Sequence, residues 1–214
     1  MARQKLSRRR ALITLERRLW AAGAQLVAGV DEVGRGPLAG PVIAAAVVFP
    51  AGCKGVKGVN DSKELTERER NLLDRRIRRR ALAFALGAAS AREIDRFNIL
   101  RASHIAMRRA LARLRLDVDH VIVDSLRVPD LGREQTAVVD GDAKVHCVAC
   151  ASVIAKVARD RVMKRLAARY PQYGWETNVG YGTPEHRAAL LEFGPSPHHR
   201  LSFAPTLQYS LELF

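Results

Sequence analysis

Four acidic side chains stand where apolar runs of this chain end, a placement that suits metal chemistry. The first run ends in Asp31 and Glu32, the second in Asp124, and the third in Asp142. A carboxylate at the end of a buried strand is costly unless a partner or a cation compensates its charge. Strands of one sheet can bring their ends together, so we expect these acids to meet in one site.

All-oxygen ligation selects Mg²⁺ or Mn²⁺ over zinc, and cations between the four carboxylates would relieve their mutual repulsion. Two such ions can activate a water and stabilise the leaving oxygen of a phosphodiester, which predicts phosphodiester hydrolysis. Any one of these acids alone could equally be a turn residue or a helix cap. Asp140 also competes with Asp142 for the fourth position, and spacing alone does not choose between them.

The elements that would position these acids alternate strands and helices, which predicts an α/β domain with a mixed sheet. A capping box at Thr66 and Glu69 opens one of the helices. The expected strands are 26–30, 41–49, 81–88, 121–123 and 136–139, and the expected helices are 66–80, 98–114, 147–169 and 184–193. We expect a basic leader at 1–24, a catalytic domain at 25–170 and a small helical, loop-rich C-terminal element and tail at 171–214. For the leader, a solvated extension is favoured over an arm that binds nucleic acid.

The overall charge points to a polyanionic partner. The chain has 36 Lys and Arg against 22 Asp and Glu, a formal net charge of +14 in 214 residues, so nucleic acid is the first expectation. The three cysteines fit neither a disulfide framework nor a four-ligand zinc site, which indicates a reducing, cytoplasmic location. No signal peptide or membrane-spanning stretch is recognisable, and we expect a monomer.

Eight ordered segments between about residues 26 and 205 together resemble bacterial ribonuclease HII. They are Gly29–Pro37, Asn60–Lys63, Ile94–Asp95 with Asn98–Leu100, Val123–Asp124, Gly141–Asp142, Ala151–Asp160, Gly180–Tyr181 and His198–Phe203. The resemblance implies a ribonuclease H-like sheet, with Asp31, Glu32, Asp124 and Asp142 as catalytic ligands of two Mn²⁺ or Mg²⁺ ions. Asp140 then becomes a neighbouring acid.

The same resemblance implies an activity and a role. Its family hydrolyses the RNA strand of RNA/DNA hybrids and nicks duplex DNA 5′ to embedded ribonucleotides, leaving 3′-hydroxyl and 5′-phosphate ends. Repair of genomic ribonucleotides and removal of RNA primers would be its tasks. Only the 2′-hydroxyl marks a ribonucleotide locally, so a reader of the ribose must approach it closely.

The segment Gly34-Arg35-Gly36 suits that approach, because glycines let the backbone come near and Arg35 can pair with a phosphate. Without the adjacent acids it would be an ordinary turn. Tyr181 resembles the aromatic residue that packs on the sugar after the ribonucleotide. By the same resemblance, phosphate contacts are expected from Ser62, Lys63, Asn98, Ser152 and Lys156.

Two features depart from the family pattern. Glu64 stands where a second lysine is common, and Cys147 and Cys150 stand where small residues are usual; for the cysteines we favour core packing over redox or metal function. The related ribonuclease HIII lacks the arginine between the glycines and carries a sizeable N-terminal domain.

The C-terminal residues Ser210, Leu211, Glu212, Leu213 and Phe214 resemble the motif by which bacterial replication proteins dock on the sliding clamp. The alternative, a tail packed on its own domain, is favoured by the sequence alone. Two rival functions also stay open: a strand transferase of the same fold, and a basic protein that binds nucleic acid without cutting it.

Overall fold

The computed structural model describes residues 11–59, 62, 65–204 and 206. The expectations for Asn60, Asp61, Lys63, Glu64 and the tail 210–214 therefore lie outside the described residues. Within the described part, no helix combines the length and apolar character that crossing a bilayer requires.

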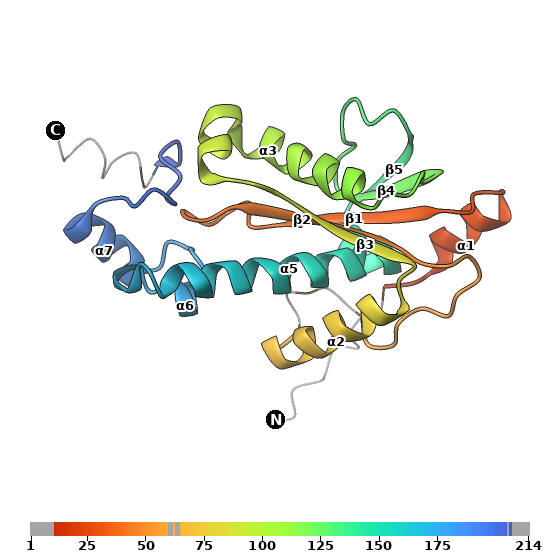
Figure 1. The fold of residues 1–214 in the computed structure, drawn as a ribbon, viewed down its shortest axis with the longest axis horizontal. Helices are drawn as coiled ribbons and strands as arrows, with labels where there is room; N and C mark the ends of the chain where they lie inside the picture. Colours follow the sequence, from red (N-terminus) through yellow and green to blue (C-terminus); the bar gives the residue numbers. More distant parts are fainter. Residues whose placement is uncertain (1–10, 60–61, 63–64, 205, 207–214) are drawn as a thin grey trace, which may run out of the picture.

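A five-stranded mixed sheet forms the centre of the molecule, in the order β3-β2-β1-β4-β5 (Figure 1). The antiparallel pairs are β1 with β2 and β2 with β3, and the parallel pairs are β1 with β4 and β4 with β5. The strands are β1 (Val27–Val33), β2 (Val42–Val48), β3 (Ala83–Ala89), β4 (His120–Asp124) and β5 (Glu134–Val138). The mixed sheet predicted from the sequence is confirmed, with strand ends shifted by a few residues.

Helices cover both faces of the sheet, with α3 on one face and α5 and α2 on the other (Figure 1). Every residue of β2 is buried, and successive side chains of this strand enter the two cores in turn. The helices are α1 (Thr14–Ala21), α2 (Glu67–Arg80), α3 (Ala91–Arg113), α4 (Gly141–Lys144), α5 (His146–Ala167), α6 (Trp175–Asn178) and α7 (Pro184–Phe193), with a 3₁₀ turn η1 (Pro171–Tyr173).

Local sequence signals explain where two helices begin. The predicted capping box at Thr66 and Glu69 opens α2. A second capping box, formed by Ser90 and Glu93, starts α3 at Ala91, well before the expected start at Asn98. Asn98 instead lies inside α3 at a kink, with φ 65° and ψ 166°, a strained region of backbone space that is otherwise almost confined to glycine.

The solvated extension expected for the leader is wrong for its described residues. Leu15, Leu19 and Trp20 of α1 pack against the core beneath α5. Glu16 is buried there, and its carboxylate accepts a hydrogen bond of 2.7 Å from the backbone N–H of Cys147 at the start of α5. Because α5 has no side-chain cap of its own, α1 supplies one from far away in the sequence.

The core under α5 is close-packed. Cys147 and Cys150 are buried free thiols in it, as the packing interpretation expected. A Cβ at Gly29 would overlap the backbone of Cys147, so only glycine lets β1 and α5 approach this closely. At the far end of α5, the buried Trp175 and Tyr173 join α6 and α7 in a third, smaller core.

Candidate active site

A cleft of about 300 Å³ opens where β1 and β4 separate. These parallel neighbours pair only as far as Val30 and Val123, and β1 then continues to Val33 beside β2 alone. Asp31 and Glu32 therefore lie inside β1 rather than after it, which corrects the expected end of this strand. The cleft is lined by Asp31, Glu32, Val33, Gly34, Arg35, Gly36, Ser62, Asp124, Asp142, Ser152, Lys156 and Tyr181.

Adjacent positions on a strand point to opposite faces, and the acidic pair follows this rule. Asp31 is directed to the α5 face, where Ser152 donates a hydrogen bond to it. Glu32 also lines a small recess beneath α3, beside Ser103 and His104. The pairing of β1 with β4 stops just before these two residues, so no neighbouring strand covers this edge of β1. Both side chains can therefore reach the cleft, although they start from opposite faces of the strand.

The electrostatics of the cleft favour binding of cations. Asp31 is only 4% exposed, and its pKa is raised well above the ordinary value, first by burial and then by the charges of Glu32 and Asp124. Burial also raises the pKa of Glu32, against the lowering effect of Arg35. Glu32 Oε2 is buried without a hydrogen-bond partner among the described residues.

The other two acids are fixed by local backbone. Asp124 Oδ1 accepts from the Gly141 N–H at 2.7 Å, and Oδ2 accepts from Ser125 Oγ at 3.0 Å. Asp142 lies in the first turn of α4 and is 7% exposed. Asp140 takes the left-handed conformation just before α4, and its side chain, 70% exposed, lies 3.5 Å from Lys144. The structure thus places Asp142 in the cleft and Asp140 outside it.

Hard divalent cations fit this set of donors, which is made of carboxylate oxygens with one orphaned buried acceptor on Glu32. Among the described residues, no group of three or more His, Cys, Asp or Glu side chains forms, as it stands, a cage that could hold a metal ion. Mg²⁺ rarely uses such a cage, because it keeps several waters and takes one or two carboxylates together with phosphate oxygens of a substrate. The cleft suits that partial ligation.

Two buried arginines shape the loop that carries Gly34-Arg35-Gly36. Arg200 donates to the carbonyl oxygens of Gly34, Arg35 and Gly40 at 2.6 to 3.0 Å. Arg159 donates to those of Ala39, Pro41 and Val179 at 2.9 to 3.0 Å. Both arginine side chains are fully buried. The loop therefore wraps around two guanidinium groups, which bind its backbone carbonyls rather than its side chains.

Burial lowers the pKa of Arg159 to about 10 and that of Arg200 to about 9, so both remain charged at neutral pH. Gly34 has φ 101°, and a Cβ there would overlap the Arg159 side chain. Sequence reasoning missed both arginines because arginine normally indicates exposure. Their position within segments that resemble a known family was the one available signal.

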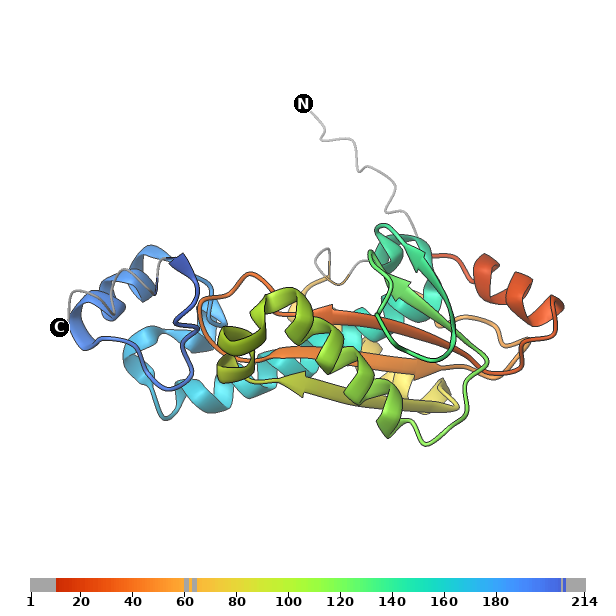
Figure 2. The same cartoon turned by 90° about the horizontal axis from the view of Figure 1, so that it is seen from above.

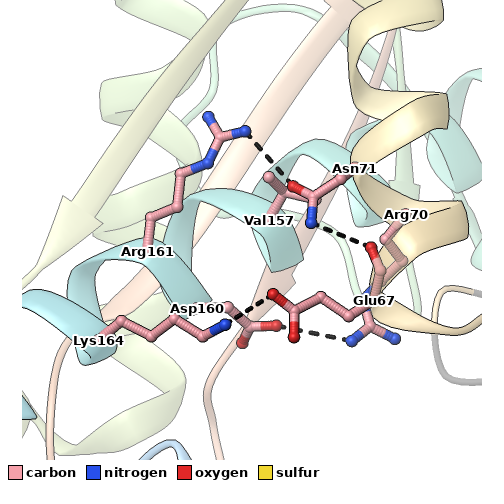
Figure 3. Close-up of a pocket in the computed structure, with 7 residues that line it drawn as sticks. All are labelled: Glu67, Arg70, Asn71, Val157, Asp160, Arg161 and Lys164. Carbon is pink, nitrogen blue, oxygen red and sulfur yellow. Dashed lines mark hydrogen bonds and ion pairs between the residues drawn. The ribbon is translucent and has the colours of Figure 1, made fainter. Parts of the chain in front are cut away.

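The α5 side of the cleft is held by a network that reaches α2. Ser62 Oγ and Ser152 Oγ lie 2.9 Å apart, and Lys156 Nζ donates to Asp160 at 2.6 Å. Arg70 of α2 also contacts Asp160, at 3.7 Å (Figure 3). It donates in addition to the backbone oxygens of Ser62 and Leu65. Arg70 and Asp160 thereby position Ser62 and Lys156.

Tyr181 lies at the mouth of the cleft and is 48% exposed. Its backbone oxygen accepts a hydrogen bond from His186 Nδ1 at 2.8 Å. His186 Nε2 then accepts from Trp175 Nε1 at 3.1 Å and from His199 Nε2 at 2.9 Å. Burial lowers the pKa of both histidines, that of His199 to about 3, so this support is neutral at physiological pH.

The cleft brings together most of the residues expected from the sequence. Asn98 is exposed and does not line it; its Oδ1 instead accepts from the Arg101 N–H at 3.1 Å. The role of Lys63 lies outside the described residues.

Known proteins resemble this chain in sequence and in structure. The sequence model of the ribonuclease HII family matches residues 28–206. Ribonuclease HII of Thermosynechococcus vestitus is 52% identical over 193 residues, which cover 90% of each chain. That of Paracoccus denitrificans is 54% identical, covering 90% of this chain and 91% of its own.

Solved structures share the fold. Ribonuclease H2 of Pyrococcus horikoshii has a TM-score of 0.71 and 26% identity over 87% of this chain and 98% of its own. Ribonuclease HII of Archaeoglobus fulgidus, solved in complex with PCNA, has a TM-score of 0.68 and 27% identity over 83% of this chain and 95% of its own. A ribonuclease HIII described as Bst, in complex with Mn²⁺, has a TM-score of 0.69 at 20% identity, covering 89% of this chain and 70% of its own. The family match and the two bacterial relatives show that this chain belongs to the ribonuclease HII family and is a ribonuclease H-type hydrolase.

Proposed function

We propose that the chain hydrolyses the RNA strand of RNA/DNA hybrids and nicks duplex DNA 5′ to embedded ribonucleotides, leaving 3′-hydroxyl and 5′-phosphate ends. One observation carries the proposal: four carboxylates, the Gly34–Gly36 loop and Tyr181 line the same cleft. The groups that would recognise the ribose therefore lie beside the groups that would cut next to it. Removal of genomic ribonucleotides and of RNA primers is the corresponding task.

Asp31, Glu32, Asp124 and Asp142 are the proposed ligands of two Mg²⁺ or Mn²⁺ ions. Bound there, divalent ions would supply an activated water and stabilise the charge on the leaving oxygen. The raised pKa of Asp31 and Glu32 supports this assignment, because carboxylates that repel one another gain most from cations placed between them.

The neighbouring residues would bind and orient the nucleic acid. Arg35 is half-exposed and lies 3.3 Å from Glu32, so it can pair with a phosphate while remaining beside the carboxylates. Gly36 is exposed and leaves its backbone open to the ribose, Gly34 holds the turn that presents it, and Tyr181 can pack on the following sugar. Ser62, Ser152 and Lys156 are proposed phosphate contacts, and Lys63 and Asn98 remain predictions.

Incubation of a duplex that carries one ribonucleotide with Mg²⁺ or Mn²⁺ tests the proposal. We expect wild type to nick 5′ to the ribonucleotide and Asp124→Asn to be inactive. An all-DNA duplex of the same sequence is the control and should stay intact. No metal-dependent nicking by wild type would refute the assignment.

The same assay separates the rival functions. A strand transferase would act without a 2′-hydroxyl in its substrate. A protein that only binds nucleic acid would keep its affinity in chelator and lose nothing measurable on Asp124→Asn.

We also propose that Ser210–Phe214 docks on a sliding clamp, because this tail resembles a clamp-binding motif and a structural relative was solved in complex with PCNA. Deletion of Leu211–Phe214 should abolish clamp binding and leave nicking intact. Undetectable clamp binding by the full-length chain would contradict this proposal.

A further inference from the structure

A second groove, of about 290 Å³, lies at the β3 edge of the sheet, where four arginines surround apolar residues of β2, β3 and α5. The arginines are Arg78 of α2, Arg113 of α3, and Arg161 and Arg165 of α5. β3 is the terminal strand, with β2 between it and β1, and Figure 2 shows it at the edge of the sheet away from β4 and β5. The groove is therefore separate from the cleft, with β2 between its edge strand and the strand that carries Asp31 and Glu32.

The positive charge of this groove exceeds its local compensation. Asp74 contacts two of the arginines, Arg78 at 2.7 Å and Arg161 at 3.7 Å, and its side chain is itself only 2% exposed. Arg113 donates to the Leu86 carbonyl at 2.8 Å, and Arg165 to that of Arg161 at 3.3 Å. Four guanidinium groups thus face one described carboxylate.

At the adjacent junction between α2 and α5, positive side chains are paired with acidic side chains of the other helix. Lys164 pairs with Glu67 at 2.6 Å, and Arg70 lies 3.7 Å from Asp160. Figure 3 shows Arg161 extending from α5 toward Asn71, away from these pairs. Arg161 thus links α5 to α2, whereas Arg113 and Arg165 have no carboxylate partner among the described residues and supply the surplus charge of the groove.

The four guanidinium groups of the lining favour a ligand that carries phosphates. Guanidinium groups bind phosphate oxygens in pairs, and each of these arginines uses only part of its five donors in the contacts above. A peptide adding a strand to β3 is disfavoured, because Arg113 and Arg109 cover the edge carbonyls of Leu86 and Ala88.

We propose that this groove is a second nucleic-acid-binding surface, which holds the phosphate backbone of a duplex segment other than the one in the cleft. The inference rests on the proposed function only in taking nucleic acid as the ligand. A surface of this kind would retain the protein on DNA between sites without reading sequence.

Salt-dependent binding of a labelled all-DNA duplex to the full-length protein in chelator tests the inference. The variant Arg113→Gln/Arg165→Gln removes two contacts, so the slope of log K against log salt should become shallower by about 2, at roughly 0.9 per lost phosphate contact. Arg113→Lys/Arg165→Lys should keep most of the slope, because it retains the charge. Thermal unfolding checks that each variant is folded.

Lys54→Gln/Lys57→Gln is the matched control, because it removes two charges from an exposed loop outside the groove. It should leave the slope near that of wild type. An equal slope for wild type and Arg113→Gln/Arg165→Gln would overturn the inference, and so would groove-dependent capture of polyglutamate in preference to DNA, which would indicate an acidic protein as the partner. Nicking is not measured in this assay, so failure of the proposed nuclease activity would be seen separately.

Discussion

Replacement of Arg200 by methionine should both destabilise the fold and impair the cleft. The side chain is fully buried and makes four hydrogen bonds to the carbonyls of Gly34, Arg35 and Gly40. Methionine keeps much of the apolar volume but donates nothing, so these three carbonyls lose their partner. The loop that presents Arg35 to the cleft would no longer be held in its present conformation.

The expected cost follows from these contacts. Each orphaned buried carbonyl costs ~1–3 kcal/mol, and three would cost several. Removing a buried charge recovers part of this sum, because desolvation of the guanidinium no longer opposes folding. We therefore expect the free energy of unfolding to fall by roughly 3 kcal/mol, at the low end of what breaking a buried charged contact costs.

Urea unfolding of Arg200→Met beside wild type measures this loss, with Arg187→Met on the exposed surface of α7 as control. The control should stay within about 0.5 kcal/mol of wild type. Nicking by Arg200→Met should be reduced even where the protein is fully folded. A loss below about 1 kcal/mol with normal nicking would refute the view that this arginine organises the loop.

Three further predictions concern single carboxylates. Glu16→Ala should lower the free energy of unfolding by about 1 kcal/mol or more in urea, because it removes the acceptor at the start of α5, whereas Glu16→Gln should cost less. Asp31→Asn should abolish nicking yet raise the thermal midpoint in chelator. Because the folded-state pKa of Asp31 is raised, its stabilising contribution is complete below the ordinary value of 3.8 and is lost as pH rises through the raised pKa, so the gain over wild type should grow with pH; a gain that shrinks would contradict this. Asp140→Asn should nick at the wild-type rate, and a strong loss would show that this exposed acid takes part after all.

Periodicity predicted the mixed sheet and strand-end acids predicted the carboxylates of the cleft, whereas its other lining residues were expected only from the resemblance to ribonuclease HII. They could not predict that β1 continues through Asp31 and Glu32. This continuation depends on the pairing of β1 with β2, which extends to Val33, whereas the pairing of β1 with β4 stops at Val30. The kink at Asn98 was missed for a similar reason, since the pattern of apolar residues is helical on either side of it.

Hydrogen bonds between charged side chains and backbone groups far away in the sequence were the features that the sequence predicted least well. Nothing local in the sequence marks Glu16 as a cap for α5, or Arg159 and Arg200 as buried donors to a loop more than a hundred residues away. Charged residues are usually exposed to solvent, and these three are exceptions because each is bound by backbone groups, through one carboxylate oxygen only in the case of Glu16.

The parallel pairing of β1 with β4 also has a consequence for biosynthesis. β1, β2 and β3 follow one another along the chain as antiparallel neighbours and can associate early. β4 lies beside β1 in the sheet but is separated from it in sequence by β2, α2, β3 and α3, so this pair forms later. Asp124 and Asp142 thus join Asp31 and Glu32 only late, after most of the chain has left the ribosome. A nascent chain would carry the basic α2 before it carries a complete set of carboxylates, so the cleft could not hold its proposed ions until late in synthesis.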